Sequence, residues 1–175
     1  MAKLLSEDEE IKSRLEIFFL KEKSKDTAWL PYKISLESGD KKLNFEKTSR
    51  GTGDYLFAVT PVNEIENLTV GIDNLIKSKE NKTFFFEPAE PSFELIIEKS
   101  FKGYSVTCWA DAGNVISDHY TWDGFGIRFF TTKEKLKYFV EELIKEKEEF
   151  FVASSEGFSK SEKPERCEIK SQKVK

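Results

Sequence analysis

Residues 103–131 have the sequence GYSVTCWADAGNVISDHYTWDGFGIRFFT, in which two strand-like patterns flank a polar loop. Apolar residues recur at every second position on both sides of the loop: Tyr104, Val106, Cys108 and Ala110 before it, and Phe125, Ile127 and Phe129 after it. This period is typical of a strand that buries one face, so Trp109 is expected on the opposite face. The Asp123-Gly124 dipeptide adds a tight-turn signal where the second strand begins. The stretch therefore predicts two strands joined by a loop.

The loop and its borders combine carboxylates with large aromatic side chains. Five residues are candidates for contact with a partner: Asp111, Asp118, His119, Tyr120 and Trp122. Aromatic rings supply contact area and carboxylates supply directional acceptors, as a recognition surface requires. The alternative for Trp122, and for Trp109, is that each indole covers the second face of the sheet. We expect the loop residues to form a partner-binding site.

Outward from this stretch, further strands and two helices are predicted. Alternating or β-prone segments occur at residues 15–19, 30–36, 43–45, 55–60, 82–87 and 92–99. Residues 62–78 and 131–144 instead show apolar residues at spacings of three and four, which predicts amphipathic helices. Thr131 and Glu134 have capping-box spacing. The predicted fold class is α+β, a largely antiparallel β-sheet with two amphipathic helices packed on one face.

Chain length and composition predict one domain. The 175 residues suffice for one buried core. After Phe151 the sequence becomes too polar to bury much apolar surface, so we expect a single domain at 1–152 and a disordered tail at 153–175. Gly71 interrupts the first predicted helix at a cost of about 1 kcal/mol relative to Ala, and marks either close packing on the sheet or simple tolerance.

Signatures of catalytic and metal sites are missing. His119 is the single histidine, and no Gly-x-Ser-x-Gly turn provides a nucleophile for it. Cys108 and Cys167 are too few for a zinc site or a disulfide framework. The loop acids do not have the spacing of a calcium-binding loop. We expect a protein that is not an enzyme and has no cofactor and no metal; a small hydrolase that uses His119 is a distant alternative.

Charge favours a basic protein partner. The formal net charge is −4, and the segment from Glu156 onward has six basic and four acidic residues, or +2, which leaves −6 for the preceding body. An acidic body disfavours direct nucleic-acid binding because phosphates require Lys and Arg. Residues 1–10 have no signal-peptide pattern, and no apolar run is long enough to cross a membrane. We expect a cytoplasmic location without membrane binding.

Several motifs in the opening stretch resemble a known family. They are an Asp-x-Gly-Asn strand end at Asp111, Gly113 and Asn114, a Tyr-x-x-Asp-Gly-x-Gly-Ile-Arg-Phe segment at residues 120–129, and a Thr-capped helix at residues 131–144. Together they resemble the WapI-type immunity proteins of bacterial polymorphic toxin systems. The similarity is clearest over residues 93–144.

The resemblance implies a non-enzymatic immunity protein. Such a protein binds its cognate toxin C-terminal domain and neutralises it by covering the active site. Toxins of these systems often end in nuclease domains, so the implied partner is a basic nuclease. The alternative is an adaptor or scaffold domain that binds another protein and has no toxin partner.

Overall fold

Alternating apolar residues form two antiparallel sheets in this computed structural model, which describes residues 1–8, 10–19, 29–45, 58–88, 93–111 and 124–158. The first sheet has the order β1-β2-β3-β4. Strand β5 also pairs with β3, at residues 29–32, whereas β4 pairs with residues 34–38 of β3. Its strands are β1 (Ala2–Leu5), β2 (Ser13–Phe19), β3 (Trp29–Ser38), β4 (Lys41–Phe45) and β5 (Ala58–Pro61). Gly39, with a φ of 60°, permits the tight turn between β3 and β4.

The second sheet contains the two strands predicted within residues 103–131. Its order is β6-β7-β8-β9, and every neighbouring pair is antiparallel. The strands are β6 (Thr83–Phe86), β7 (Phe93–Ser100), β8 (Gly103–Asp111) and β9 (Gly124–Thr131). Gly103, with a φ of 126°, begins β8 after the short β7–β8 turn. The predicted antiparallel α+β class is confirmed, but the strands form two sheets where one was expected.

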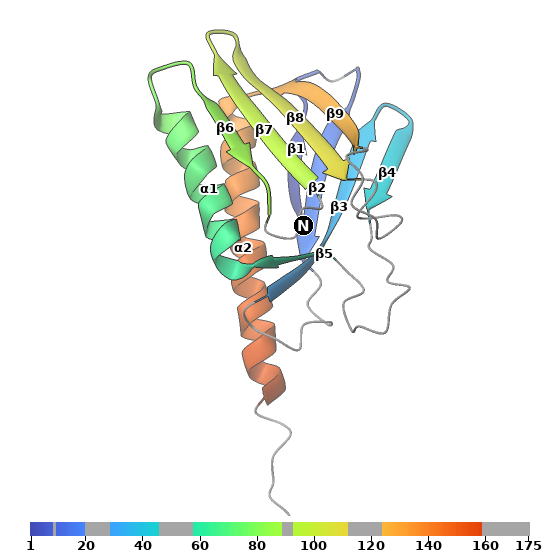
Figure 1. Ribbon diagram of the computed structural model, residues 1–175, viewed down its shortest axis with the longest axis vertical. Coiled ribbons are helices and arrows are strands. Elements are labelled where there is room, and N and C mark those ends of the chain that lie inside the picture. Colours follow the sequence, from blue (N-terminus) through green and yellow to red (C-terminus); the bar gives the residue numbers. More distant parts are fainter. Residues whose placement is uncertain (9, 20–28, 46–57, 89–92, 112–123, 159–175) are drawn as a thin grey trace, which may run out of the picture.

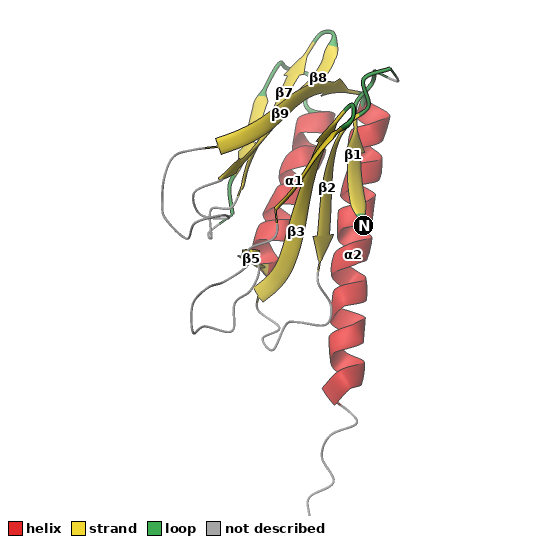
Figure 2. Cartoon of the chain, turned by 90° about the vertical axis from the view of Figure 1, so that its right-hand side faces the viewer, coloured by secondary structure: helices red, strands yellow, loops and turns green. Residues whose placement is uncertain are grey.

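Two helices bridge the edges of the two sheets. Helix α1 (Val62–Lys77) packs beside β6, α2 (Lys133–Phe158) packs beside β1, and the helices contact each other (Figure 1). The sheets are inclined to each other, and their facing sides supply most of the core (Figure 2). Leu15, Leu95 and Phe139, from both sheets and α2, are fully buried within one cluster. Burying each such side chain stabilises the fold by about 1.5–3 kcal/mol.

Two ends of the fold differ from the sequence prediction. The polar N-terminal segment contains β1, whose Ala2 and Leu4 are fully buried. Helix α2 continues beyond residue 144 to Phe158, so residues 153–158 of the predicted tail are helical. The extension is rich in Lys and Glu, which are good helix formers. Residues 159–175 lie outside the described part of the chain.

The start of α2 also corrects the predicted cap. Thr132, not Thr131, accepts a hydrogen bond from the Lys135 amide at its side-chain oxygen, over 3.3 Å. Thr131 still belongs to β9, and its hydroxyl donates to the carbonyl of Leu5 over 2.6 Å. The Thr131 side chain therefore joins the two sheets.

Candidate binding surface

The predicted site residues meet the described structure only at its border. Asp111 is the last residue of β8, and its backbone lies opposite Gly124 of β9. Asp118, His119, Tyr120 and Trp122 belong to residues 112–123, which lie outside the described residues. Strand β8 ends at Asp111 and β9 begins at Gly124, so both residues that flank this segment lie at the same end of the second sheet. The assignment of these five residues to an interface remains a prediction.

The second sheet has an outer face that we call the aromatic face. It consists of the side chains that point away from the core, at alternate positions of β6 to β9: Thr83, Phe85, Glu94, Ile96, Glu98, Ser105, Thr107, Trp109, Gly126, Arg128 and Phe130. Three of its large rings are strongly exposed, Phe85 at 54%, Trp109 at 44% and Phe130 at 60%. Three exposed rings on one face of a sheet make this face a candidate interaction surface.

Trp109 has a defined position on the aromatic face because of Gly126. The two residues are cross-strand neighbours in β8 and β9. A Cβ atom built at Gly126 would lie 2.5 Å from Cε3 of the Trp109 indole, so the ring occupies the space that a side chain would need. An aromatic ring that covers a cross-strand glycine shields the backbone and loses some of its own freedom. The Trp109 ring is therefore restrained by Gly126 while part of it stays exposed.

Arg128 is held in the next row of the same face. Its Nε donates a hydrogen bond to Oγ1 of Thr107 over 2.9 Å, and Thr107 is only 3% exposed. The bond fixes the arginine across β8, and its terminal guanidinium nitrogens bond no acceptor of the described residues.

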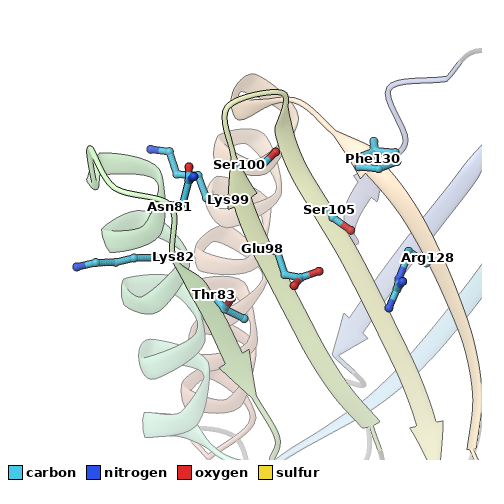
Figure 3. Close-up of a pocket in the computed structure, with 9 residues that line it drawn as sticks. All are labelled: Asn81, Lys82, Thr83, Glu98, Lys99, Ser100, Ser105, Arg128 and Phe130. Atoms are coloured by element: carbon cyan, nitrogen blue, oxygen red, sulfur yellow. The ribbon is translucent and has the colours of Figure 1, made fainter.

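A shallow depression of about 500 Å³ lies at one end of the aromatic face (Figure 3). It forms because Ser105 is small, while Glu98 on β7 and Phe130 on β9 extend on either side of it. The residues that line it are mostly polar: Asn81, Lys82, Thr83, Glu98, Lys99, Ser100, Ser105, Arg128 and Phe130. A side chain of a partner can enter it; its openness does not suit an enclosed small-molecule site.

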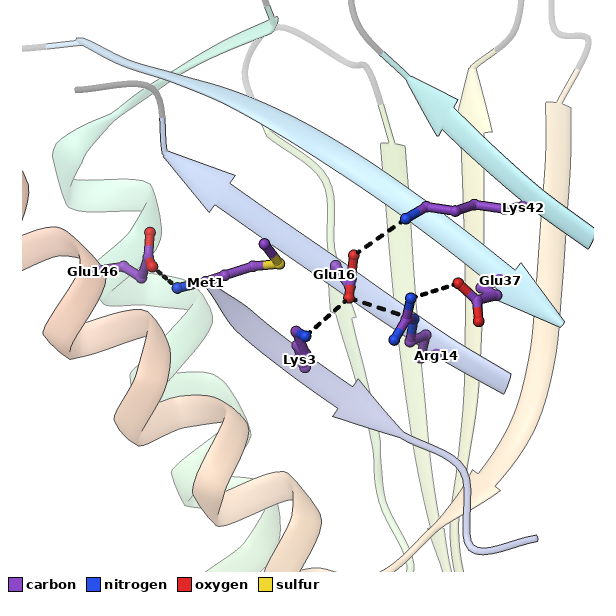
Figure 4. A network of polar contacts seen from close by, with 7 residues as sticks. All are labelled: Met1, Lys3, Arg14, Glu16, Glu37, Lys42 and Glu146. Atoms are coloured by element: carbon purple, nitrogen blue, oxygen red, sulfur yellow. Dashed lines mark hydrogen bonds and ion pairs between the residues drawn. The ribbon is translucent and has the colours of Figure 1, made fainter. Parts of the chain in front are cut away.

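The outer face of the first sheet has a different character (Figure 4). Glu16, only 7% exposed, lies 3.5 Å from Lys3 Nζ, 3.3 Å from Arg14 Nε and 3.9 Å from Lys42 Nζ. The Arg14 contact is an ion pair without hydrogen-bond geometry, since Nε is buried and has no hydrogen-bond partner. Arg14 Nη2 also donates to Glu37 over 2.6 Å. The charges on this face are largely occupied with one another.

Cys108 provides no reactive thiol. It is fully buried on the inner face of β8. Burial raises the pKa of the Cys108 thiol far above its usual range, and the charge of Glu94 raises it further. The nucleophilic form of cysteine is the thiolate, so this thiol is inert at neutral pH. In the described part of the chain, no three His, Cys, Asp or Glu side chains gather as metal ligands.

Sequence reasoning placed Trp109 on the second face correctly but missed that a whole surface surrounds it. Phe85, Arg128 and Phe130 come from β6 and β9, and only strand order and register bring them to one side. The sequence of residues 125–130, FGIRFF, does indicate that Arg128 and Phe130 lie on the face opposite to the buried Phe129, because side chains alternate along a strand. It does not indicate which residues of other strands lie beside Arg128 and Phe130.

No family model, curated protein or solved structure matches this chain. The segment that contains the sequence motifs, residues 93–144, includes β7, β8, β9 and the first part of α2. It therefore includes most of the aromatic face. None of the described helices is both long enough and apolar enough to cross a membrane.

Proposed function

We propose that this protein is an immunity protein that binds a cognate bacterial toxin domain, a basic nuclease, and neutralises it by covering its active site. The observation that supports the proposal most is the aromatic face, with Trp109 held against Gly126 in the two strands that flank residues 112–123 in the sequence. The motif resemblance lies in the same strands. In this proposal the protein acts in the cytoplasm by binding alone and contributes no catalytic group.

The aromatic face offers a useful amount of binding energy. Each Trp or Phe ring can bury about 150–250 Å². Phe85, Trp109 and Phe130 are each about half exposed, so a partner would remove about 300 Å² of ring surface from water. At about 25 cal/mol per Å² this is about 7 kcal/mol before the costs of association. The rest of a standard interface would come from surrounding residues, including the predicted loop contacts.

The charges beside the rings favour a protein over a nucleic acid. Sheets that bind single-stranded nucleic acid combine exposed rings with Lys and Arg along the phosphate path. Here Glu94 and Glu98 share the aromatic face with one cation of that face, Arg128. Two carboxylates would repel a phosphate backbone. The acidic body would also steer a basic nuclease toward this protein at low salt.

A growth-protection assay tests the proposal. The first step is to establish whether the gene directly upstream encodes a large secreted protein. The C-terminal domain of such a protein is then expressed in a bacterial host with and without this chain. We expect the chain to restore growth and to co-purify with the domain. Trp109→Ala should weaken binding by about 2 kcal/mol, roughly thirtyfold, mainly through faster dissociation.

Phe101 provides the matched control. It is 87% exposed in the β7–β8 turn and lies outside the aromatic face, so Phe101→Ala should leave protection unchanged. Failure of the wild-type chain both to bind the domain and to restore growth would refute the immunity role. Binding without restored growth would instead indicate an adaptor.

A further inference from the structure

The acidic residues of the two outer faces differ in their pairing. On the first sheet, Glu16 and Glu37 both form ion pairs with Arg14. On the aromatic face, Glu94 and Glu98 form no ion pair with any described residue, and Glu98 is exposed. With respect to the described residues, both carboxylates are available to cations from another molecule.

Each of these carboxylates shares a cross-strand row with an aromatic residue. Glu94 on β7 lies directly opposite Trp109 on β8, whose ring covers Gly126 on the far side of the row. Directly opposed side chains have Cβ atoms about 4.5–5.5 Å apart. Glu98 lies opposite the small Ser105, and Phe130 follows on the next strand. Glu98, Ser105 and Phe130 all line the shallow depression of Figure 3.

A carboxylate beside a ring is a suitable site for Arg or Lys. The carboxylate supplies the counter-charge, and the ring face attracts the cation by about 0.5–1 kcal/mol at an exposed site. Arginine fits better than lysine because its planar guanidinium stacks on a ring and bonds a carboxylate with two N–H groups.

The spacing of the two sites fits an extended chain. Glu94 and Glu98 are four residues apart on β7, which corresponds to about 13 Å in a strand. Ile96 lies between them on the same face and is partly exposed. An extended ligand with basic residues at positions 1 and 5 and an apolar residue at position 3 would present all three to this row.

Net charge distinguishes the two outer faces as well. The outward positions of the aromatic face carry Glu94, Glu98 and Arg128, which gives −1. Lys82 and Lys99 also line the depression, and the Lys99 ammonium is bonded to the carbonyls of Ile76 and Ser78. The described outer face of the first sheet has four cations, Lys3, Arg14, Lys33 and Lys42, and two acids, Glu16 and Glu37, which gives +2. Of the two surfaces, the aromatic face is the more favourable for a basic ligand.

We infer that the aromatic face binds an extended basic segment of its partner, whose two Arg side chains contact Glu94 with Trp109 and Glu98 with Phe130. The inference rests on the proposed function, because it names the toxin chemistry that this face recognises. Arg128, held by Thr107, lies beside the row and bonds a carbonyl or carboxylate of the same segment.

The test is a titration of the full ¹⁵N-labelled chain with the blocked peptide Arg-Thr-Val-Thr-Arg, followed by NMR. We expect dose-dependent shifts at the Trp109 indole N–H and at the amides of Glu94 and Glu98, with a Kd of millimolar order, as a few exposed contacts allow. Trp109→Phe identifies the indole signal among those of the three tryptophans. A peptide with Lys at both ends should bind more weakly, and one with Glu at both ends should not bind.

Paired variants make the test specific. E94Q/E98Q should weaken peptide binding at least tenfold, whereas E141Q/E148Q, which removes the same charge from exposed positions of α2, should change it less than twofold. Equal binding of the Glu peptide, shifts outside the aromatic face, or no effect of E94Q/E98Q would overturn the inference. So would self-association of the chain through this face.

The two proposals fail in different ways. If the Arg peptide does not bind but the chain restores growth and Trp109→Ala weakens its binding to the upstream domain, the immunity role stands and the basic-segment inference falls. If the peptide binds as described and the upstream domain is neither bound nor neutralised, the face recognises basic segments and the immunity role falls.

Discussion

Gly71→Ala is expected to destabilise the protein although it replaces glycine within a helix. Gly71 lies on the side of α1 that faces β6, and a Cβ atom built there would lie 2.0 Å from Cε2 of Phe84. Cζ and Cδ2 of the same ring lie at 2.6 and 2.8 Å. Ordinary carbon contacts are about 3.5–4 Å, so the ring must retreat by at least about 1.5 Å. The close packing considered for Gly71 in the sequence is therefore present.

Two opposing terms set the size of the effect. Alanine in the helix interior gains about 1 kcal/mol over glycine. Displacing a packed ring costs about 1–3 kcal/mol, and the upper half of that range applies because three ring carbons overlap the new atom. The expected net loss is about 1–2 kcal/mol, which lowers the Tm of a 175-residue domain by about 2–8 °C.

A double-mutant cycle with Phe84→Val separates the two terms. Valine removes the ring atoms that overlap, so Gly71→Ala in that background should stabilise the protein by about 1 kcal/mol. The coupling energy between the two sites would then be about 2–3 kcal/mol. Asn74→Ala, at an exposed position of α1, serves as the control for helix propensity alone and should be slightly stabilising.

Urea denaturation of the four variants in the cycle, followed by circular dichroism, gives these free energies. If Gly71→Ala stabilises the wild-type chain as much as it stabilises the Phe84→Val chain, the packing of α1 against β6 is not as described, and the reasoning fails.

Two further predictions concern charge. Glu16→Gln should lower the free energy of unfolding by about 1–3 kcal/mol, because three cations lose their shared carboxylate; this cost lies between those typical of an exposed and of a buried ion pair. The control Glu80→Gln, which breaks an exposed ion pair with Lys82, should lower it by less than about 0.5 kcal/mol. Equal losses for the two variants would contradict the role of Glu16. The pKa of Cys108 is raised on folding, so as the pH rises the unfolded chain loses the thiol proton before the folded chain does. The free energy of unfolding should therefore be unaffected by this thiol below about pH 8.5 and fall above it by up to about 1.4 kcal/mol per pH unit. Cys108→Ala should show a shallower fall in alkaline urea denaturation, and an identical fall would count against the buried thiol.

The sequence predicted the elements of this fold well where periodicity was strong. Helix α1 was expected at residues 62–78 and is Val62–Lys77, and β7, β8 and β9 lie where the alternation placed them. Strand β1 was missed because four residues are too few for a period to be detected. Its identity comes from pairing with β2 and from the burial of Ala2 and Leu4, which are tertiary effects.

The binding surface was harder to predict than the strands. Alternation shows that Trp109 and Phe130 are not on the buried face, but not that each lies beside particular neighbours. The Trp109–Gly126 contact depends on a pairing across the 112–123 connection, whose length does not determine the register. The division into two sheets depends on α1, which separates β5 from β6 in the chain. Local periodicity contains neither relation.

The hydrogen bond between Thr131 and Leu5 joins residues 126 positions apart, and it has a consequence for biosynthesis. During translation at about 5–20 residues per second, β1 leaves the ribosome about 6–25 seconds before β9 and the start of α2 can reach it. For that interval β1 lacks the helix that later packs beside it. An uncovered strand edge can pair with another nascent chain. We therefore expect yield in cells to depend on holdase chaperones early in synthesis, more than the stability of the finished fold alone would suggest.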